Sequence, residues 1–168
     1  MPTWQRWFRH LRSTQALSRA LLPEAALQRL QARIRDSESQ HSGEIRLCIE
    51  ARLPWGYLRQ QLPPRARALT LFGKLRVWDT EANNGVLIYL LLADRAIEIV
   101  ADRGLNPHVS PAQWQALTQS LAQALRQHCA EDGLNQALDA VSALLRQHFP
   151  APDQSPNINE LPDAVVRL

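Results

Sequence analysis

The stretch that decides the fold is residues 84–101, which read NGVLIYLLLADRAIEIVA. Residues 86–93 form the longest uninterrupted apolar run in the chain, and a short run of this kind predicts a strand buried on both faces. Residues 96–101 predict a second strand after a tight turn at Asp94 and Arg95, so the two strands form a hairpin. A strand that is apolar throughout needs a cover on each side, and we therefore expect helices on both faces of the sheet.

Working outward, strict alternation of apolar and polar residues over 44–50 predicts a strand near a sheet edge with one packed face. Helical spacing of apolar residues predicts helices that begin near residues 4, 23, 64, 111 and 134. In the helix from residue 64, Ala68, Leu69 and Phe72 are expected to point inward. The order predicts an α/β fold, a three-layer α/β/α sandwich. Its small mixed sheet would contain a parallel β-α-β unit followed by the antiparallel hairpin.

The 168 residues are expected to form one folded domain with a distinct segment at each end. We predict an amphipathic Arg/Trp helix within residues 1–20, the α/β/α domain over 21–150 and a Pro-rich tail over 151–168. The longest apolar run is too short for a membrane span, which needs about 20 residues. Arg19 interrupts the one early stretch that resembles a signal peptide, so the cytoplasm is the expected compartment. Outside the N-terminal segment the charges nearly balance, which argues against nucleic-acid binding.

The loops before and after the hairpin carry carboxylate and amide side chains. If the turn centres on Asp94, Val86 faces Asp102, and residues 79–85 and 102–106 meet at one end of the sheet. Calcium and magnesium prefer oxygen ligands from converging loops. The candidate metal ligands are Asp79, Asn83, Asn84 and Asp102. The alternative is that these residues only form turns, as Asn and Asp do by themselves. Asp94 lies at the opposite end and is interpreted as a turn residue.

The first twenty residues combine arginines with aromatic side chains and contain no acid. The candidate partner or membrane surface consists of Trp4, Arg6, Trp7, Phe8 and Arg9. This helix could lie on an anionic membrane surface, peripheral to the inner membrane. Alternatively, it docks on the domain or on an unknown protein partner. One short helix gives weak membrane affinity, which favours docking.

Common catalytic motifs are missing from the chain. There is no GxGxxG, P-loop, HExxH, paired CxxC or GxSxG sequence. Cys48 and Cys129 lie in apolar patterns and are expected to be buried, reduced thiols. We therefore assign no catalytic residue, and whether the protein is an enzyme stays open.

The middle of the chain resembles the TPM domain. That family takes its name from a thylakoid lumen protein, a photosystem II repair protein and a nematode receptor modulator. The resemblance rests on NGVLI at 84–88 followed by Asp94-Arg95, on the strand 96–101, and on Gly104-Leu105. Residues 42–45 and Gly133 fit as well. The resemblance covers about residues 20–150, is that of a bacterial cytoplasmic member, and implies the same α/β/α sandwich.

The resemblance also implies functions: divalent-cation binding, acid phosphatase activity and maintenance of membrane protein complexes. Three features depart from the family. Asn83 and Val100 replace common carboxylates, and residues 102–106 read DRGLN where the family has a GYGLE run. Fewer carboxylates should weaken the binding of a hard cation.

Three hypotheses follow. The first is a non-catalytic TPM-type domain that binds a protein partner, in the maintenance of membrane proteins, with calcium or magnesium bound at the loop end. The alternative is a weak metal-dependent acid phosphatase acting on phosphomonoesters. The third is calcium bound only as structural support.

Overall fold

The computed structural model describes residues 3–151 and 160–168. Its strands are β1 (Ile45–Glu50), β2 (Val86–Leu91), β3 (Ala96–Ala101) and β4 (Val166–Arg167). Its α-helices are α1 (Thr3–Arg12), α2 (Gln15–Leu21), α3 (Glu24–Glu38), α4 (Trp55–Arg59), α5 (Pro64–Lys74), α6 (Pro111–Arg126) and α7 (Ala130–His148). A short 3-10 helix, η1 (Arg103–Leu105), follows β3. The helices predicted from periodicity are all present, and the structure adds α2, α4, η1 and β4.

The four strands form one mixed sheet in the order β3-β2-β1-β4. Strand β1 runs parallel to β2 and to β4, and β2 pairs with β3 in an antiparallel hairpin, which confirms the predicted parallel unit and hairpin. The predicted register was wrong by one residue, because Val86 pairs with Ala101 and not with Asp102. Asp102 instead donates its backbone N–H to Gly85 just beyond the ladder.

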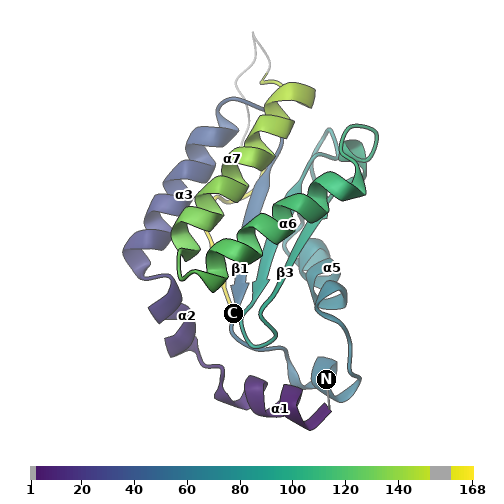
Figure 1. Ribbon diagram of the computed structural model, residues 1–168. Helices are drawn as coiled ribbons and strands as arrows, with labels where there is room; N and C mark the ends of the chain where they lie inside the picture. The colour runs from purple at the N-terminus through teal and green to yellow at the C-terminus, as the bar shows by residue number, and fades with distance from the viewer. Residues whose placement is uncertain (1–2, 152–159) are drawn as a thin grey trace.

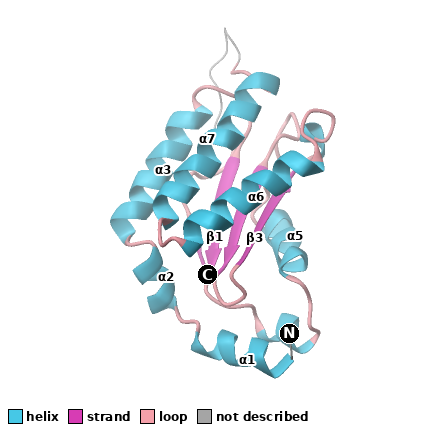
Figure 2. Cartoon of the chain, viewed as in Figure 1, coloured by secondary structure: helices cyan, strands magenta, loops and turns pink. Residues whose placement is uncertain are grey.

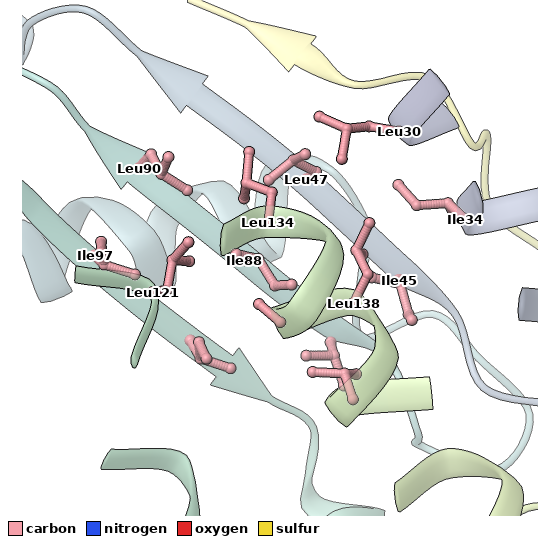
Figure 3. Close-up of a cluster of buried hydrophobic side chains, with 14 of the residues drawn as sticks. Leu30, Ile34, Ile45, Leu47, Ile88, Leu90, Ile97, Leu121, Leu134 and Leu138 are labelled. Atoms are coloured by element: carbon pink, nitrogen blue, oxygen red, sulfur yellow. The ribbon is translucent and has the colours of Figure 1, made fainter. Parts of the chain in front are cut away.

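Helices cover both faces of the sheet, which confirms the three-layer sandwich (Figures 1 and 2). Helices α3, α6 and α7 lie over one face, where Leu47, Ile88 and Leu138 belong to the larger apolar core (Figure 3). Helices α4 and α5 contribute to the smaller core on the opposite face, around Leu87 and Leu71. Helix α1 lies beneath the sheet, past the ends of β1 and β2 (Figure 1).

Three expectations about exposure were wrong. Strand β1 lies next to the edge strand β4, near the sheet edge as expected, but all six of its residues are buried where only one face was expected to be packed. Its polar Glu50 has a buried partner in Arg67, which is the inward residue of α5 where Leu69 was expected to point in. Leu69 is exposed. Cys129 is exposed as well, because it lies in the turn between α6 and α7.

Gly85 fixes the start of β2 through a close backbone approach. A Cβ built on Gly85 would lie 1.9 Å from the carbonyl oxygen of Val77, which belongs to the loop after α5. Real Cβ atoms essentially never come this close, so only glycine lets the loop pack against the strand. This close approach explains why the NGVL sequence has a glycine at residue 85. The contact also positions the loop that leads into β2.

Candidate functional site

The sheet has two ends with different chemistry. The loop end lies where β1 and β2 begin and β3 finishes, and it carries the four predicted metal ligands. The carboxyl end lies where β1 and β2 finish and β3 begins, and α1 crosses it (Figure 1). In open α/β sheets, ligands bind beyond the carboxyl ends of the strands.

The structure brings three of the four predicted metal ligands into one loop cluster. Gly104 donates its backbone N–H to the carbonyl of Asn83, so the two loops lie in contact as predicted. Asn84 is fully buried, and its amide nitrogen donates to the hydroxyl of Ser42. Asp102 accepts the backbone N–H of Arg103 at 2.7 Å. Within residues 3–151 and 160–168, no hydrogen bond or ion pair joins Asp79 to this cluster. Its carboxylate is half exposed, 3.8 Å from Arg76.

Two features of the loop cluster bear on cation binding in opposite ways. The Arg103 guanidinium donates to Oδ1 of Asn83 at 2.9 Å, so a positive charge already occupies one predicted ligand oxygen. In contrast, Oδ1 of Asn84 and Oδ2 of Asp102 are buried without a hydrogen-bond partner, and such oxygens suit a hard cation. In the described part of the chain, no three His, Cys, Asp or Glu residues are grouped so as to hold a metal.

Buried carboxyl groups also gather at the loop end. Glu38 accepts the backbone N–H of Ile45 at 2.8 Å and shares a side-chain hydrogen bond with Asp163. Burial raises the pKa of Glu38 to about 9; the Ile45 hydrogen bond opposes the shift, and the charges of neighbouring carboxylates add to it. Burial likewise raises the pKa of Glu44, whose Oε1 accepts the backbone N–H of Glu160. These groups tie α3, β1 and the C-terminal segment together.

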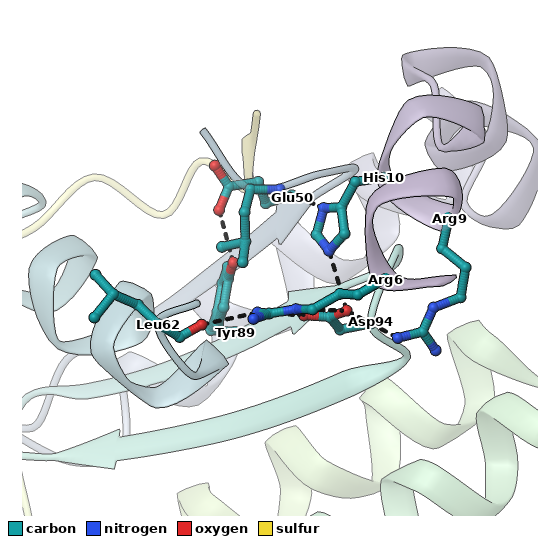
Figure 4. A network of polar contacts seen from close by, with 8 residues as sticks. Arg6, Arg9, His10, Glu50, Leu62, Tyr89 and Asp94 are labelled. Carbon is teal, nitrogen blue, oxygen red and sulfur yellow. Dashed lines mark hydrogen bonds and ion pairs between the residues drawn. The ribbon is translucent and has the colours of Figure 1, made fainter. Parts of the chain in front are cut away.

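At the carboxyl end, Asp94 is the centre of a polar network (Figure 4). Arg6 donates from Nη2 and Nε to Oδ2 at 2.8 and 3.0 Å, and Arg9 donates to Oδ1 at 3.2 Å. Nε2 of His10 lies 3.0 Å from the same Oδ1. The Asp94 side chain is only 8% exposed. Asp94 therefore does more than form a turn, because it holds three side chains of α1 on the domain.

The hydrogen bonds of His10 fix its tautomer. The backbone N–H of Leu53 donates to Nδ1 at 3.1 Å, so Nδ1 carries no proton and Nε2 is the donor to Asp94. Burial by itself would raise the pKa of Asp94, but the hydrogen bonds from His10 and Arg6 outweigh it and lower that pKa to about 2. Asp94 is thus a permanent anion at neutral pH.

A second buried network lies close to the first. The hydroxyl of Tyr89 donates to Glu50 at 2.6 Å, and the Arg67 guanidinium donates to both oxygens of the same carboxylate (Figure 4 shows Glu50 and Tyr89). Burial, followed by the charge of Glu50, raises the pKa of Tyr89. Burial also raises the pKa of the Cys48 thiol to about 12, so this cysteine is not an activated nucleophile.

Helix α1 is flanked by cavities. One of about 500 Å³ opens at the carboxyl end and is lined in part by Trp7, Leu11, Arg52 and Trp55. A second of about 310 Å³ is bordered by Arg6 and Asp94. Hydrogen bonds to Asp94, together with the edge-on contact between the rings of Trp7 and Trp55, thus hold a helix that is otherwise loosely packed.

The predicted contact residues divide between two faces of α1. Arg6 and Arg9 face the domain, and Trp7 is partly buried. Trp4 and Phe8 point to solvent, with exposed fractions of 61% and 59%. We call Trp4, Phe8, Leu11 and Trp55 the aromatic stripe; Leu11 and Trp55 are 60% and 61% exposed and border one cavity. Sequence analysis assigned no role to His10 or Trp55, whereas the four- and three-residue spacing of Trp4, Phe8 and Leu11 predicts their common helix face.

Sequence analysis also missed a contact between a serine and a histidine. Ser37 Oγ lies 2.8 Å from Nε2 of His41, and Nδ1 of His41 lies 2.9 Å from the carbonyl of Gly43. His41 is fully buried, and burial lowers its pKa to about 4. Ser37 also contacts Ser142 of α7, and neither of the two cavities described above is lined by this group. The arrangement therefore joins α3 to α7 rather than forming an open active site.

Comparisons with known proteins agree with this architecture. The BA42 protein of the psychrophilic bacterium Bizionia argentinensis has a similar solution structure, with a TM-score of 0.75 and 27% sequence identity over 88% of this chain and 95% of that one. The N-terminal domain of a P. gingivalis protein shares the fold, with a TM-score of 0.62 and 21% identity over 79% of this chain and 83% of that domain. No curated protein matches the sequence.

The sequence model of the TPM domain family matches residues 17–144. The match includes β1, the β2–β3 hairpin and helices α3 to α6, together with most of α7, and it begins after α1. Because it spans well over half of the 168 residues, the chain belongs to the TPM domain family.

Proposed function

We propose that this protein is a non-catalytic TPM domain whose role, in the maintenance of membrane proteins, is to bind a partner through the aromatic stripe on α1 and α4. The observation that carries the proposal is the orientation of α1. An amphipathic helix on a water-soluble domain normally packs its apolar face against the core and leaves its polar face in water. Helix α1 does the opposite, since Arg6 and His10 face the domain while Trp4 and Phe8 face solvent.

The exposed aromatic area is too concentrated to be incidental. Single exposed apolar residues are normal on protein surfaces, but contiguous patches mark interaction sites. Trp4 and Phe8 contact one another edge to face at 6.1 Å between ring centroids. Aromatic residues are enriched at protein interfaces, and tryptophan is among the residue types that contribute most to binding energy there. The stripe therefore fits a contact surface held ready by the domain.

The hydrogen bonds, pKa shifts and burial of the polar groups support a non-catalytic role. Asp94 is saturated by three donors and has a lowered pKa, which makes it a poor general acid or base at neutral pH. The raised pKa of Cys48 argues against a nucleophilic role for that thiol, and the burial of His41 argues against a role as a base in an open site.

Site-specific photocross-linking in living cells tests the proposal. A benzoylphenylalanine placed at Phe8 should give a discrete adduct, because this position lies within the contact surface. The matched control is Leu69 of α5, which is 52% exposed and outside the stripe. The proposal fails if Phe8 gives no adduct with either a protein or a lipid, or if both positions give the same adducts.

A second candidate function is a metal-dependent phosphatase at the loop end. Oδ1 of Asn84 and Oδ2 of Asp102, which are buried without a hydrogen-bond partner, favour it because calcium and magnesium prefer oxygen ligands of this kind. Asp79 could add a carboxylate if its loop moved inward.

Thermal unfolding with and without millimolar calcium or magnesium tests this candidate. Saturation at about 100 times Kd would stabilise the wild type by about 2.7 kcal/mol, and the shift should vanish in Asp79→Ala/Asp102→Ala. Metal-stimulated hydrolysis of a phosphomonoester should disappear in each single variant. An unchanged melting temperature with no hydrolysis would eliminate cation binding and turnover together.

A further inference from the structure

We infer that the partner of the aromatic stripe is an anionic lipid bilayer, on which the domain rests peripherally through its carboxyl end. The inference depends on the proposed function, because it identifies what the stripe binds. Every helix in the described part of the chain is too short or too polar to span a membrane. Attachment by this surface would therefore be interfacial and reversible.

The shape of the stripe fits a lipid interface. Trp4, Phe8 and Leu11 form one solvent-facing row along α1, and Trp55 extends the row onto α4 through its ring contact with Trp7. Tryptophan and phenylalanine are the residues that interfacial helices place at the boundary between headgroups and acyl chains. The arginines Arg12, Arg52 and Arg59 are exposed beside the row, where they would reach the headgroups.

Charge is segregated in the chain in a way that favours an anionic surface. Residues 1–23 and 51–78 hold ten of the nineteen basic residues and none of the sixteen acidic ones. These segments supply α1, α2, α4 and α5. The first three of these helices lie around the carboxyl end (Figure 1). The nearby acid, Asp94, is 8% exposed and already paired with Arg6, Arg9 and His10. The remaining segments are net acidic, so the excess of basic residues is concentrated in the segments that supply these four helices.

Preorganisation overcomes the weak affinity of a single short helix. A free peptide of ten residues must fold when it reaches the bilayer, and an isolated helix of that length is marginal in water. Here the domain holds α1 in helical form through Asp94 and presents its apolar face outward. Binding then costs little ordering entropy, which raises affinity without any new contact.

Vesicle sedimentation with the full chain tests the inference. The probes are vesicles of phosphatidylcholine alone and vesicles in which one third of the lipid is phosphatidylglycerol. We expect sedimentation with the anionic vesicles, little with the neutral ones, and progressive release as salt is added. Replacement of two aromatic residues, Trp4→Ala/Phe8→Ala, should lower the partition coefficient at least about tenfold.

The matched control is Leu69→Ala/Trp78→Ala, which removes two equally exposed apolar side chains from outside the stripe. It should sediment like the wild type. Absence of sedimentation with anionic vesicles, or an equal loss in both double variants, would overturn the membrane inference. If Phe8 still cross-links to a protein in cells, the proposed binding function survives and only the lipid partner is rejected. If Phe8 yields no adduct and the vesicles are not bound, both fail.

Discussion

The two ends of one small sheet shift the pKa values of their carboxyl groups in opposite directions. At the loop end, Glu38 is buried among other carboxyl groups and its pKa rises to about 9. At the carboxyl end, the Asp94 side chain is only 8% exposed, yet the hydrogen bonds from His10 and Arg6 lower its pKa to about 2. The comparison shows that burial alone does not decide the charge of a carboxyl group; the neighbouring donors do.

The two ends also differ in what holds them together. Close backbone packing around Gly85 and Gly104 fixes the loop end, where a Cβ on either glycine would overlap a carbonyl oxygen. Hydrogen bonds and ion pairs to Asp94 fix α1 at the carboxyl end, with cavities on either side. We therefore expect the loop end to be rigid and α1 to be the part of the fold that opens first.

The largest effect is expected at Gly85. The change Gly85→Ala places a Cβ 1.9 Å from the Val77 carbonyl, so the loop or β2 must shift. We expect the free energy of unfolding to fall by at least about 3 kcal/mol in urea denaturation. The control Gly73→Ala lies in α5 with no atom within 4 Å and should be neutral or slightly stabilising. Equal, small effects at both glycines would show that the loop end is not fixed by close packing.

The next largest effect is expected at Asp94. Its stability contribution should be present above pH 3.8 and be lost as the pH falls towards 2, because the folded-state pKa is the lower one. Asp94→Asn should lower the free energy of unfolding at pH 7 by about 2 kcal/mol and flatten the acid limb of its pH profile. Asp79→Asn, which changes a half-exposed carboxylate at the loop end, should cost under about 0.5 kcal/mol. Indistinguishable profiles for the two variants would contradict the proposed role of Asp94.

At Glu38 we expect a change in the free energy of unfolding that is opposite in sign to the change at Asp94. Because its folded-state pKa is raised from 4.5 to about 9, the chain is most stable with respect to this group below pH 4.5 and loses stability as the pH rises towards 9. Glu38→Gln keeps an oxygen for the Ile45 N–H and supplies a donor for Asp163. It should raise the free energy of unfolding at pH 8 by about 1 kcal/mol or more, and by little at pH 4.

Glu24→Gln on the same helix is the control for this measurement, because Glu24 is exposed. It should change the free energy of unfolding at pH 8 by less than about 0.5 kcal/mol. A variant at Glu38 that loses stability at pH 8 would mean that the native state needs an ionised carboxylate there.

The smallest effect on stability is expected from the aromatic stripe. Trp4 and Phe8 are mostly exposed, so Trp4→Ala/Phe8→Ala should change the free energy of unfolding by less than about 0.5 kcal/mol. The same variant should lose vesicle binding, which would separate the function of α1 from the stability of the fold. A drop in melting temperature as large as that of Asp94→Asn would instead make the stripe part of the core.

The sequence predicted the features that rest on local pattern. The apolar run at 86–93 and the turn at Asp94 predicted the hairpin, and helical periodicity from residue 111 predicted α6, whose N-cap is Ser110. The strand β4 was missed because two residues carry no periodic signal. Strand β1 was predicted to have only one packed face, because Arg46 and Glu50 alternate with apolar residues as solvent-facing groups do, although both are buried.

The candidate sites also divide into features that local sequence pattern predicts and features that it does not. The convergence of the Asn83 and Asp102 loops followed from the hairpin, since paired strands bring their flanking loops together. The network at Asp94 joins residues 84 to 88 positions apart, and no spacing rule connects them. The available signal was the absence of acids from the first twenty residues, which leaves Arg6 and Arg9 in need of an acidic partner from elsewhere in the chain.

The central claim is that Asp94 holds α1 on the domain with its apolar face outward, and amide hydrogen exchange tests it most directly. In the wild type, the amides of residues 7–12 should be protected, while in Asp94→Asn they should exchange rapidly as those of β1 and β2 stay protected. Unprotected α1 amides in the wild type, or the same protection in both proteins, would contradict the claim.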